Sequence, residues 1–145
     1  EIEINQQCIM DQENSITNFY KKNNIKNYVF KFDKNILKLL LSSDLAITRC
    51  GASTTAELLH TQTPFIAVPL PNSIDNHQYL NAKYYENNGC CWLLEQKNFN
   101  TKNLFNLIME TIKDKNKLEN IRKNMKKNYN TNVYNDIENE IKEFI

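Results

Sequence analysis

The sequence predicts a doubly wound α/β fold, in which helices cover both faces of a parallel sheet, followed by a helical C-terminal tail. Three observations support this prediction. Strand-like and helix-like segments alternate along residues 1–100. The strand-like segments at 45–47 and 65–68 are short continuous apolar runs, which are typical of strands buried on both faces. After Thr101 the apolar residues recur only at helical spacing.

Each element is predicted from the spacing at which apolar residues recur between the few turn-forming residues. The chain has two glycines and three prolines, so each of them is a strong turn signal. The predicted α/β core at 1–100 contains a strand at 2–7, a helix at about 12–22, a strand at 28–32, a helix at 35–42, a strand at 44–48, a helix at 53–61, a strand at 65–69, a helix at 76–87 and a strand at 90–94. Three helices are expected in 101–145, marked by Leu104, Ile108 and Ile112, by Leu118, Ile121 and Met125, and by Val133, Ile137 and Ile141. Residues 1–145 are expected to form one domain.

Composition excludes several classes of function. The 18 basic and 17 acidic residues give a net charge of +1, which argues against nucleic-acid binding. The longest apolar stretches, around 39–41 and 65–70, fall far short of the roughly 18–20 residues of a transmembrane helix. The four cysteines form no C-x-x-C pair, so we expect reduced thiols and no metal site.

A first candidate site follows the buried strand at 44–48. The segment Arg49-Cys50-Gly51-Ala52-Ser53-Thr54-Thr55-Ala56-Glu57 places a small, glycine-containing turn directly before a helix. The free N–H groups and positive dipole of a helix N-terminus attract phosphate. Glu57, about one turn further on, could accept hydrogen bonds from a ribose diol. The alternative is structural, because Thr54-x-x-Glu57 also fits a capping box.

A second candidate site follows the next strand. The segment Pro69-Leu70-Pro71-Asn72-Ser73-Ile74-Asp75-Asn76-His77-Gln78-Tyr79-Leu80-Asn81-Ala82 is a proline-stiffened loop that leads into a helix. Here too a structural alternative is open, in which Asp75 and Gln78 cap the helix and His77 has no role. Both helix starts would face the same edge of a parallel sheet and together bind a ligand that carries phosphates and hydroxyls. The sequence shows no nucleophile–base pair.

These motifs carry a family resemblance. The residues are Ser43-Asp44-Leu45-Ala46-Ile47-Thr48-Arg49-Cys50-Gly51-Ala52-Ser53-Thr54, Glu57, Pro64-Phe65-Ile66-Ala67-Val68-Pro69-Leu70-Pro71, Asn76-His77-Gln78 and Asn81-Ala82. In order and spacing they resemble the C-terminal, donor-binding domain of the MurG family, the peptidoglycan N-acetylglucosaminyltransferases of glycosyltransferase family 28. The match runs from about Phe32 to Gly89 and continues more loosely to both ends of the chain.

The resemblance implies the Rossmann-like C-terminal half of a GT-B enzyme that makes lipid II at the cytoplasmic face of the bacterial inner membrane, as a peripheral protein. The donor would be UDP-N-acetylglucosamine. The acceptor would be a lipid-linked muramyl-pentapeptide, which an N-terminal domain would hold. The reaction would invert the anomeric carbon without a cofactor, and a helix N-terminus rather than a metal would stabilise the leaving diphosphate. By position, the resemblance implies that the diphosphate contacts the turn formed by Gly51, Ala52, Ser53 and Thr54. Glu57 would bind the ribose, and His77 and Gln78 would bind the N-acetylglucosamine. Phe32 and Asp33 would lie beside the uracil.

The sequence also departs from the family pattern. The glycine-rich G-G-S-x-G-A loop and the N-terminal domain, with its expected acceptor base, have no counterpart in these residues. We therefore expect a fragment that lacks its first, central strand, between the strands at 2–7 and 44–48, and that is marginally stable and inactive alone. The alternative is a donor-binding subunit or module of another GT-B UDP-sugar enzyme, which would need a partner chain.

Overall fold

The computed structural model describes residues 2–9, 11–129 and 142, and it confirms the α/β class with parallel strands. The described strands form two separate parallel sheets, β1-β2 and β3-β4-β5. By contacts, the chain divides into two compact units, residues 1–42 and 43–145.

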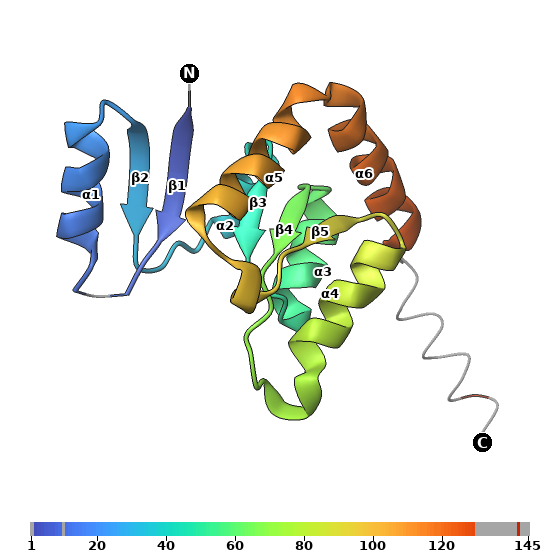
Figure 1. Cartoon of the computed structure of the whole chain (residues 1–145). Coiled ribbons are helices and arrows are strands. Elements are labelled where there is room, and N and C mark those ends of the chain that lie inside the picture. Colours follow the sequence, from blue (N-terminus) through green and yellow to red (C-terminus); the bar gives the residue numbers. More distant parts are fainter. Residues whose placement is uncertain (1, 10, 130–141, 143–145) are drawn as a thin grey trace. The chain divides into compact units, whose positions relative to one another are not determined.

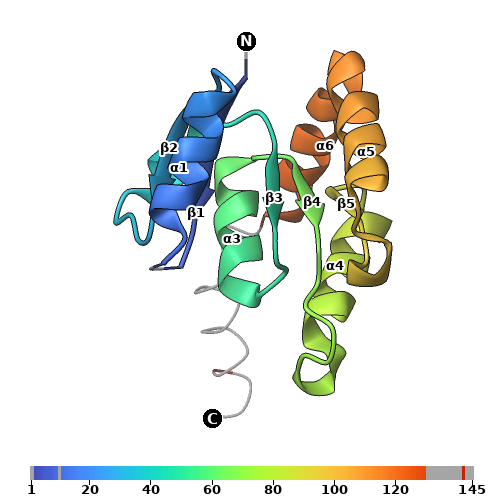
Figure 2. The ribbon, with the colours of Figure 1, turned by 60° about the vertical axis from the view of Figure 1, so that its left-hand side comes forward.

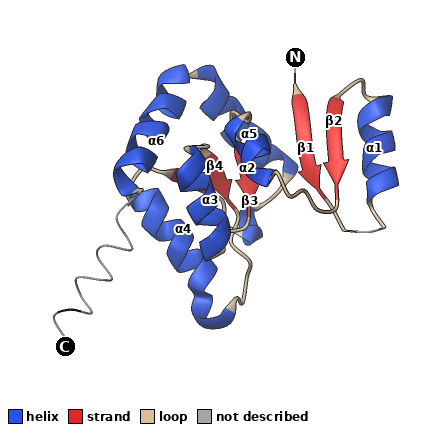
Figure 3. Cartoon of the chain, turned by 180° about the vertical axis from the view of Figure 1, so that it is seen from behind, coloured by secondary structure: helices blue, strands red, loops and turns tan. Residues whose placement is uncertain are grey.

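The first unit is a βαβ arrangement with a short additional helix. It contains β1 (Glu3–Gln7), α1 (Glu13–Lys22), β2 (Lys26–Phe30) and α2 (Ile36–Leu41). Figure 3 shows β1 and β2 running in the same direction, with Glu3 paired to Lys26 and Gln7 to Phe30. The Tyr20 hydroxyl of α1 donates to the side chain of Gln6 and so joins the helix to β1.

The second unit is built around a three-stranded parallel sheet. Its strands are β3 (Ala46–Thr48), β4 (Phe65–Ala67) and β5 (Cys91–Leu93), with β4 in the centre. The helices α3 (Ala52–Thr61) and α4 (His77–Asn87) connect them, and α5 (Thr101–Lys113) and α6 (Lys115–Asn128) follow. Short 3-10 turns at Ile74–Asn76 and Gln96–Asn98 precede α4 and α5.

Helices cover both faces of this sheet. All three residues of β4 are completely buried, as the continuous apolar run predicts. On one face, Ile66, Val68 and Leu94 form a cluster that packs against side chains of α5, including Leu104 and Ile108. Figure 2 shows α3 on one side of the strands and α5 on the other. The sheet edge at the carboxyl ends of the strands therefore carries the starts of α3 and α4 (Figure 1).

Most predicted boundaries agree with the structure to within two residues. The strand predicted at 28–32 lies two residues earlier in the structure, as β2 (Lys26–Phe30). Phe32 therefore follows the strand, and it is 80% exposed. The predicted third C-terminal helix, marked by Val133, Ile137 and Ile141, lies outside the described residues.

Candidate functional site

The candidate site lies where β3 and β4 end and their helices begin. The two strands are adjacent and parallel, with Ala46 paired to Phe65 and Thr48 to Ala67. Residues 49–51 lead from β3 into α3, and residues 68–76 lead from β4 into α4. The structure thus brings the two motifs to one edge, which is where open parallel sheets bind ligands.

Gly51 is the N-cap of α3 and leaves open space beside the helix start. Its φ of −71° and ψ of 153° are ordinary extended values, and a Cβ built on it would have no described atom within 4 Å. The first backbone bond of the helix runs from the N–H of Thr55 to the carbonyl of Gly51, at 3.0 Å. The N–H groups of Ala52, Ser53 and Thr54 precede this bond, so they have no partner within α3. The turn offers backbone donors to an anion.

The capping-box alternative for Thr54 and Glu57 is wrong. The helix begins at Ala52, so Thr54 is its third residue rather than its cap, and no side chain caps the helix. Glu57 lies in the second turn and is half-buried. Within the part of the chain that the structure describes, its carboxylate has no hydrogen-bond or ion-pair partner. The carboxylate is therefore available to accept from a ligand hydroxyl.

The cap proposed for Asp75 and Gln78 is also wrong. Asp75 and Asn76 both have left-handed backbone conformations, with φ of 49° and 54°. The cap of α4 is Asn76, and it makes no side-chain capping bond. The backbone N–H of Gln78 instead donates to Ser73 Oγ at 3.3 Å. Because two consecutive left-handed residues redirect the chain, the helix starts at His77.

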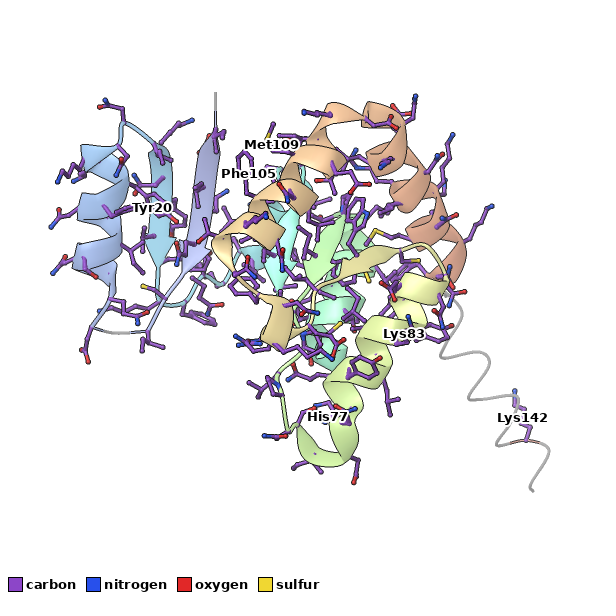
Figure 4. The ribbon with its side chains drawn as sticks, in the orientation of Figure 1. Tyr20, His77, Lys83, Phe105, Met109 and Lys142 are labelled. Carbon is purple, nitrogen blue, oxygen red and sulfur yellow. The ribbon has the colours of Figure 1, made fainter. Side chains whose placement is uncertain are left out.

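His77 lies exposed on the first turn of α4 (Figure 4). Its Nδ1 lies 2.7 Å from the carbonyl oxygen of Ile74. A carbonyl oxygen only accepts hydrogen bonds, so Nδ1 carries the proton and donates. The Nε2 of a neutral ring then remains as an acceptor for a ligand hydroxyl.

Two side chains of α4 hold the backbone of Cys50. The Gln78 Oε1 accepts from the N–H of Cys50 at 3.4 Å and from the N–H of Leu70 at 3.0 Å. The Asn81 Nδ2 donates to the carbonyl oxygen of Cys50 at 3.1 Å. The sugar-binding role predicted for Gln78 is therefore open only to its Nε2 group. Asn81 was part of the resemblance but not among the predicted site residues.

Arg49 connects the ends of the three strands and was also missed as a site residue. Its Nη1 donates to the carbonyl oxygens of Val68 at 3.1 Å and Pro69 at 3.3 Å, and to Gln96 Oε1 at 2.8 Å. A charged donor forms stronger bonds than a neutral one, so this contact helps to fix the loop after β4. An arginine directly after an apolar strand was the available signal, but its partner Gln96 lies 47 residues further along the chain.

A hollow of about 230 Å³ lies at the same edge of the sheet. Its walls are the loop at 69–71, Asn76 and Tyr79 at the start of α4, and residues 95–97 after β5. Gln96, the partner of Arg49, is one of these wall residues. The edge is therefore concave beside the start of α4.

The cysteines of the second unit are not nucleophiles at neutral pH. Cys50, Cys90 and Cys91 are all buried, and none is in a disulfide. Burial raises the pKa of the Cys50 thiol to about 11, and it also raises the pKa of Cys91 and of Cys90. The described residues contain no group of three or more His, Cys, Asp or Glu side chains that could hold a metal ion.

Phe32 and Asp33, predicted near the uracil, belong to the first compact unit. Phe32 is largely exposed. Asp33 accepts from the Tyr28 hydroxyl at 3.0 Å and from the N–H of Asn35 at 2.7 Å. The hydrogen bond to Asp33 raises the pKa of Tyr28 above its usual value. Their assignment to the site stays a prediction.

A parallel α/β domain with two helix starts at its carboxyl edge is the architecture of nucleotide-binding domains. The family can be stated more narrowly, because a family model described as "Glycosyltransferase family 28 C-terminal domain" matches residues 1–141. The chain belongs to this family, as the resemblance predicted.

Individual relatives agree with this assignment. The chain is 42% identical over 112 residues to a protein of Pelagibacter ubique, covering 74% of this chain and 32% of that protein. It is 40% identical over 119 residues to a protein of Rickettsia prowazekii, covering 82% of this chain and 31% of that protein. Both carry the name "UDP-N-acetylglucosamine--N-acetylmuramyl-(pentapeptide) pyrophosphoryl-undecaprenol N-acetylglucosamine transferase".

A solved structure supports the fold. The crystal structure of Acinetobacter baumannii MurG superposes with a TM-score of 0.82 at 24% identity, covering 97% of this chain and 41% of that one. The chain spans about a third of the length of the curated relatives above. Among the described helices, none has the length and apolar character needed to cross a bilayer.

Proposed function

We propose that this chain is the donor-binding part of a glycosyltransferase that moves N-acetylglucosamine from UDP-N-acetylglucosamine to undecaprenyl-diphospho-muramoylpentapeptide. Membership of family 28 and the names of the relatives support this reaction. The observation that carries the donor site is the open turn at Gly51. Neither the backbone conformation nor internal packing requires a glycine there, whereas a close-approaching phosphate does.

Each site residue has a role in this proposal. The diphosphate binds the backbone N–H groups of Gly51–Thr54, and the N-terminus of α3 stabilises the negative charge that develops on the leaving UDP. Glu57 accepts hydrogen bonds from the ribose hydroxyls. His77, through Nε2, and Gln78, through Nε2, hold hydroxyl or carbonyl groups of the N-acetylglucosamine.

The remaining parts of the proposal concern the whole protein. The acceptor hydroxyl attacks the anomeric carbon, and its configuration inverts as UDP leaves. We assign acceptor binding and the base that removes the hydroxyl proton to a part of the protein outside these residues, since the chain matches only about a third of each relative. Because undecaprenol is a membrane lipid, the protein works at the membrane surface, and UDP-sugar supply places it on the cytoplasmic face.

The test uses the chain in the context of a complete relative. In a chimera, the 145 residues replace the matching part of the Pelagibacter ubique protein, and calorimetry measures binding of UDP-N-acetylglucosamine. Losing a charged hydrogen-bond acceptor costs about 1.5–3 kcal/mol, so Glu57→Ala should weaken binding about 10- to 100-fold.

Glu119→Ala is the matched control, because Glu119 is an exposed glutamate of α6 away from both motifs. This variant should bind like the wild type. A folded chimera that binds no UDP-sugar, or equal affinities of the Glu57 and Glu119 variants, would contradict the proposed donor site.

A further inference from the structure

Arg49 continues the connection between the three strands beyond their last backbone bonds. The backbone bonds between the strands end at the N–H groups of Val68 and Leu94. Beyond them lies the guanidinium of Arg49. Its Nη1 donates to the carbonyl oxygens of Val68 and Pro69, at 3.1 and 3.3 Å, and to Gln96 Oε1, at 2.8 Å. One nitrogen atom of a residue after β3 therefore holds the segments after β4 and β5.

These contacts fix two walls of the hollow at the sheet edge. Pro69 and Gln96 both line the hollow, Pro69 in the segment after β4 and Gln96 in the segment after β5. Among the backbone bonds of the described residues, none joins residues 68–76 to residues 95–98. The spacing between these two walls therefore depends on the side chain of Arg49.

The composition of the hollow fits a sugar ring, which presents hydroxyl groups at its rim and apolar C–H groups on its faces. The walls combine the apolar surfaces of Pro69 and Pro71 with the side-chain amide of Gln96, as small-molecule sites do. Because arginine has only donors, the atom of Gln96 that faces Arg49 is Oε1. The Nε2 group of Gln96 is left to donate to a ligand hydroxyl.

The bonds of Arg49 leave its positive charge uncompensated. All three acceptors are neutral oxygens, and no ion pair of the described residues includes Arg49. Arginine stays protonated in proteins. The side chain therefore has two ways to affect a ligand at this edge, through the position of the walls of the hollow or through the attraction of its charge for a diphosphate.

We propose that Arg49 is a positioning residue for the sugar end of the donor, and that it acts by holding Pro69 and Gln96 at the spacing at which the hollow accepts N-acetylglucosamine. This inference rests on the proposed function, in which the sugar lies at the start of α4, beside the hollow. Small displacements of preorganised groups weaken their contacts with a ligand considerably. A positioning role therefore affects UDP-N-acetylglucosamine and leaves UDP unaffected, whereas a charge acting on the diphosphate affects both ligands equally.

The experiment measures both dissociation constants by calorimetry for two variants of the chimera, at a temperature at which circular dichroism shows them to be folded. Arg49→Met keeps an apolar stem and loses the donors, and Gln96→Leu removes the acceptor without changing the charge. We expect the Kd for UDP-N-acetylglucosamine to rise about tenfold in Arg49→Met and about threefold or more in Gln96→Leu, with the Kd for UDP within about twofold of the wild type. Arg122→Met is the matched control, because it removes the other arginine of the chain, on α6, and should bind both ligands like the wild type.

Any result in which the two ligands respond equally overturns the inference. Equal weakening of both ligands in Arg49→Met shows that the charge acts on the diphosphate, and unchanged binding in the folded variants shows that the bonds only stabilise the fold. If Arg49→Met does not fold, Gln96→Leu decides by the same criterion. A wild-type chimera that binds neither ligand overturns the proposed function itself, whereas a wild type that binds both, with variants that respond equally to them, overturns only the positioning role.

Discussion

At the scale of single residues, the two glycines of this chain differ in whether the fold requires a residue without a side chain. Gly51 has a backbone conformation that any residue adopts, and its missing side chain faces open space. Gly89 has a φ of +64°, and a Cβ there would lie 2.6 Å from Asn124 Nδ2. The fold therefore needs Gly89, whereas neither the backbone conformation nor the packing requires Gly51, which supports the proposed approach of a ligand at that position.

Gly51→Ala should leave stability almost unchanged and weaken donor binding. An alanine is a poorer N-cap than glycine but reduces the entropy of the unfolded chain, so the free energy of unfolding should change by less than about 1 kcal/mol. The added methyl group occupies the approach to the backbone donors, so the Kd for UDP should rise about tenfold or more. Denaturant titration and calorimetry on the chimera measure the two effects. Wild-type affinity in the variant would show that no ligand approaches this position.

At the scale of elements, α4 ends in a pattern of bonds that depends on Gly89. The N–H of Cys90 donates to the carbonyl of Tyr85 at 2.8 Å, and the N–H of Gly89 to that of Glu86 at 2.9 Å. This is a Schellman motif, which places a left-handed residue after the helix. Asn124 of α6 then donates to the carbonyl of Gly89 at 3.1 Å and joins the two helices.

Gly89→Ala should therefore behave in the opposite way to Gly51→Ala. A left-handed alanine costs roughly 1–2 kcal/mol, to which displacement of Asn124 adds. The free energy of unfolding should fall by at least about 1 kcal/mol, as measured by denaturant titration, with UDP affinity retained in the folded protein. A variant as stable as the wild type would argue against the described end of α4.

The sequence predicts these elements well where periodicity decides them and less well where backbone conformation does. Continuous apolar runs locate both β3 and β4, and β4 is buried on both faces as its run predicts. For β3 the expectation of burial on both faces is wrong, because it is an edge strand of the described sheet and its Ile47 is 46% exposed. The two helix caps considered from the sequence, Thr54 with Glu57 and Asp75 with Gln78, are wrong because backbone conformation decides them. Whether a polar residue caps a helix depends on where the chain turns into it, and the left-handed conformations of Asp75 and Asn76 are not evident from residue type.

At the scale of the whole molecule, the buried core is unevenly distributed. In the described residues up to Ser42, Phe30 is the only buried apolar side chain. The second unit buries the central strand of its sheet, β4, and large residues such as Leu58, Phe65 and Met125. A two-stranded sheet is marginally stable by itself, and in the first unit few apolar side chains are buried to stabilise it.

Hydrogen exchange on the 145-residue chain should reflect this difference. We expect amides of β4 to exchange at least about 100-fold more slowly than those of β1 and β2, because local opening is easiest where few apolar contacts are lost. Mass spectrometry after proteolytic digestion resolves the two regions. Equal protection in both would contradict the uneven core.

The candidate site was predictable in part at this scale. Topology alone brings the segments after β3 and β4 to one edge, so Gly51, Glu57 and His77 could be grouped from the sequence. The contacts of Arg49 with Gln96 and of Asn81 with Cys50 join residues far apart in the chain, and side-chain reach across a folded sheet leaves no local signal.

The end of α4 also has a chemical consequence. Asn88-Gly89 is the dipeptide in which an asparagine side chain most readily cyclises onto the following backbone nitrogen and deamidates. Here the Asn88 amide donates to the carbonyl of Tyr84 at 2.8 Å, and the Gly89 nitrogen is engaged with Glu86. The folded helix end keeps the two reacting groups occupied, so deamidation to isoaspartate at position 88 requires that helix end to open first.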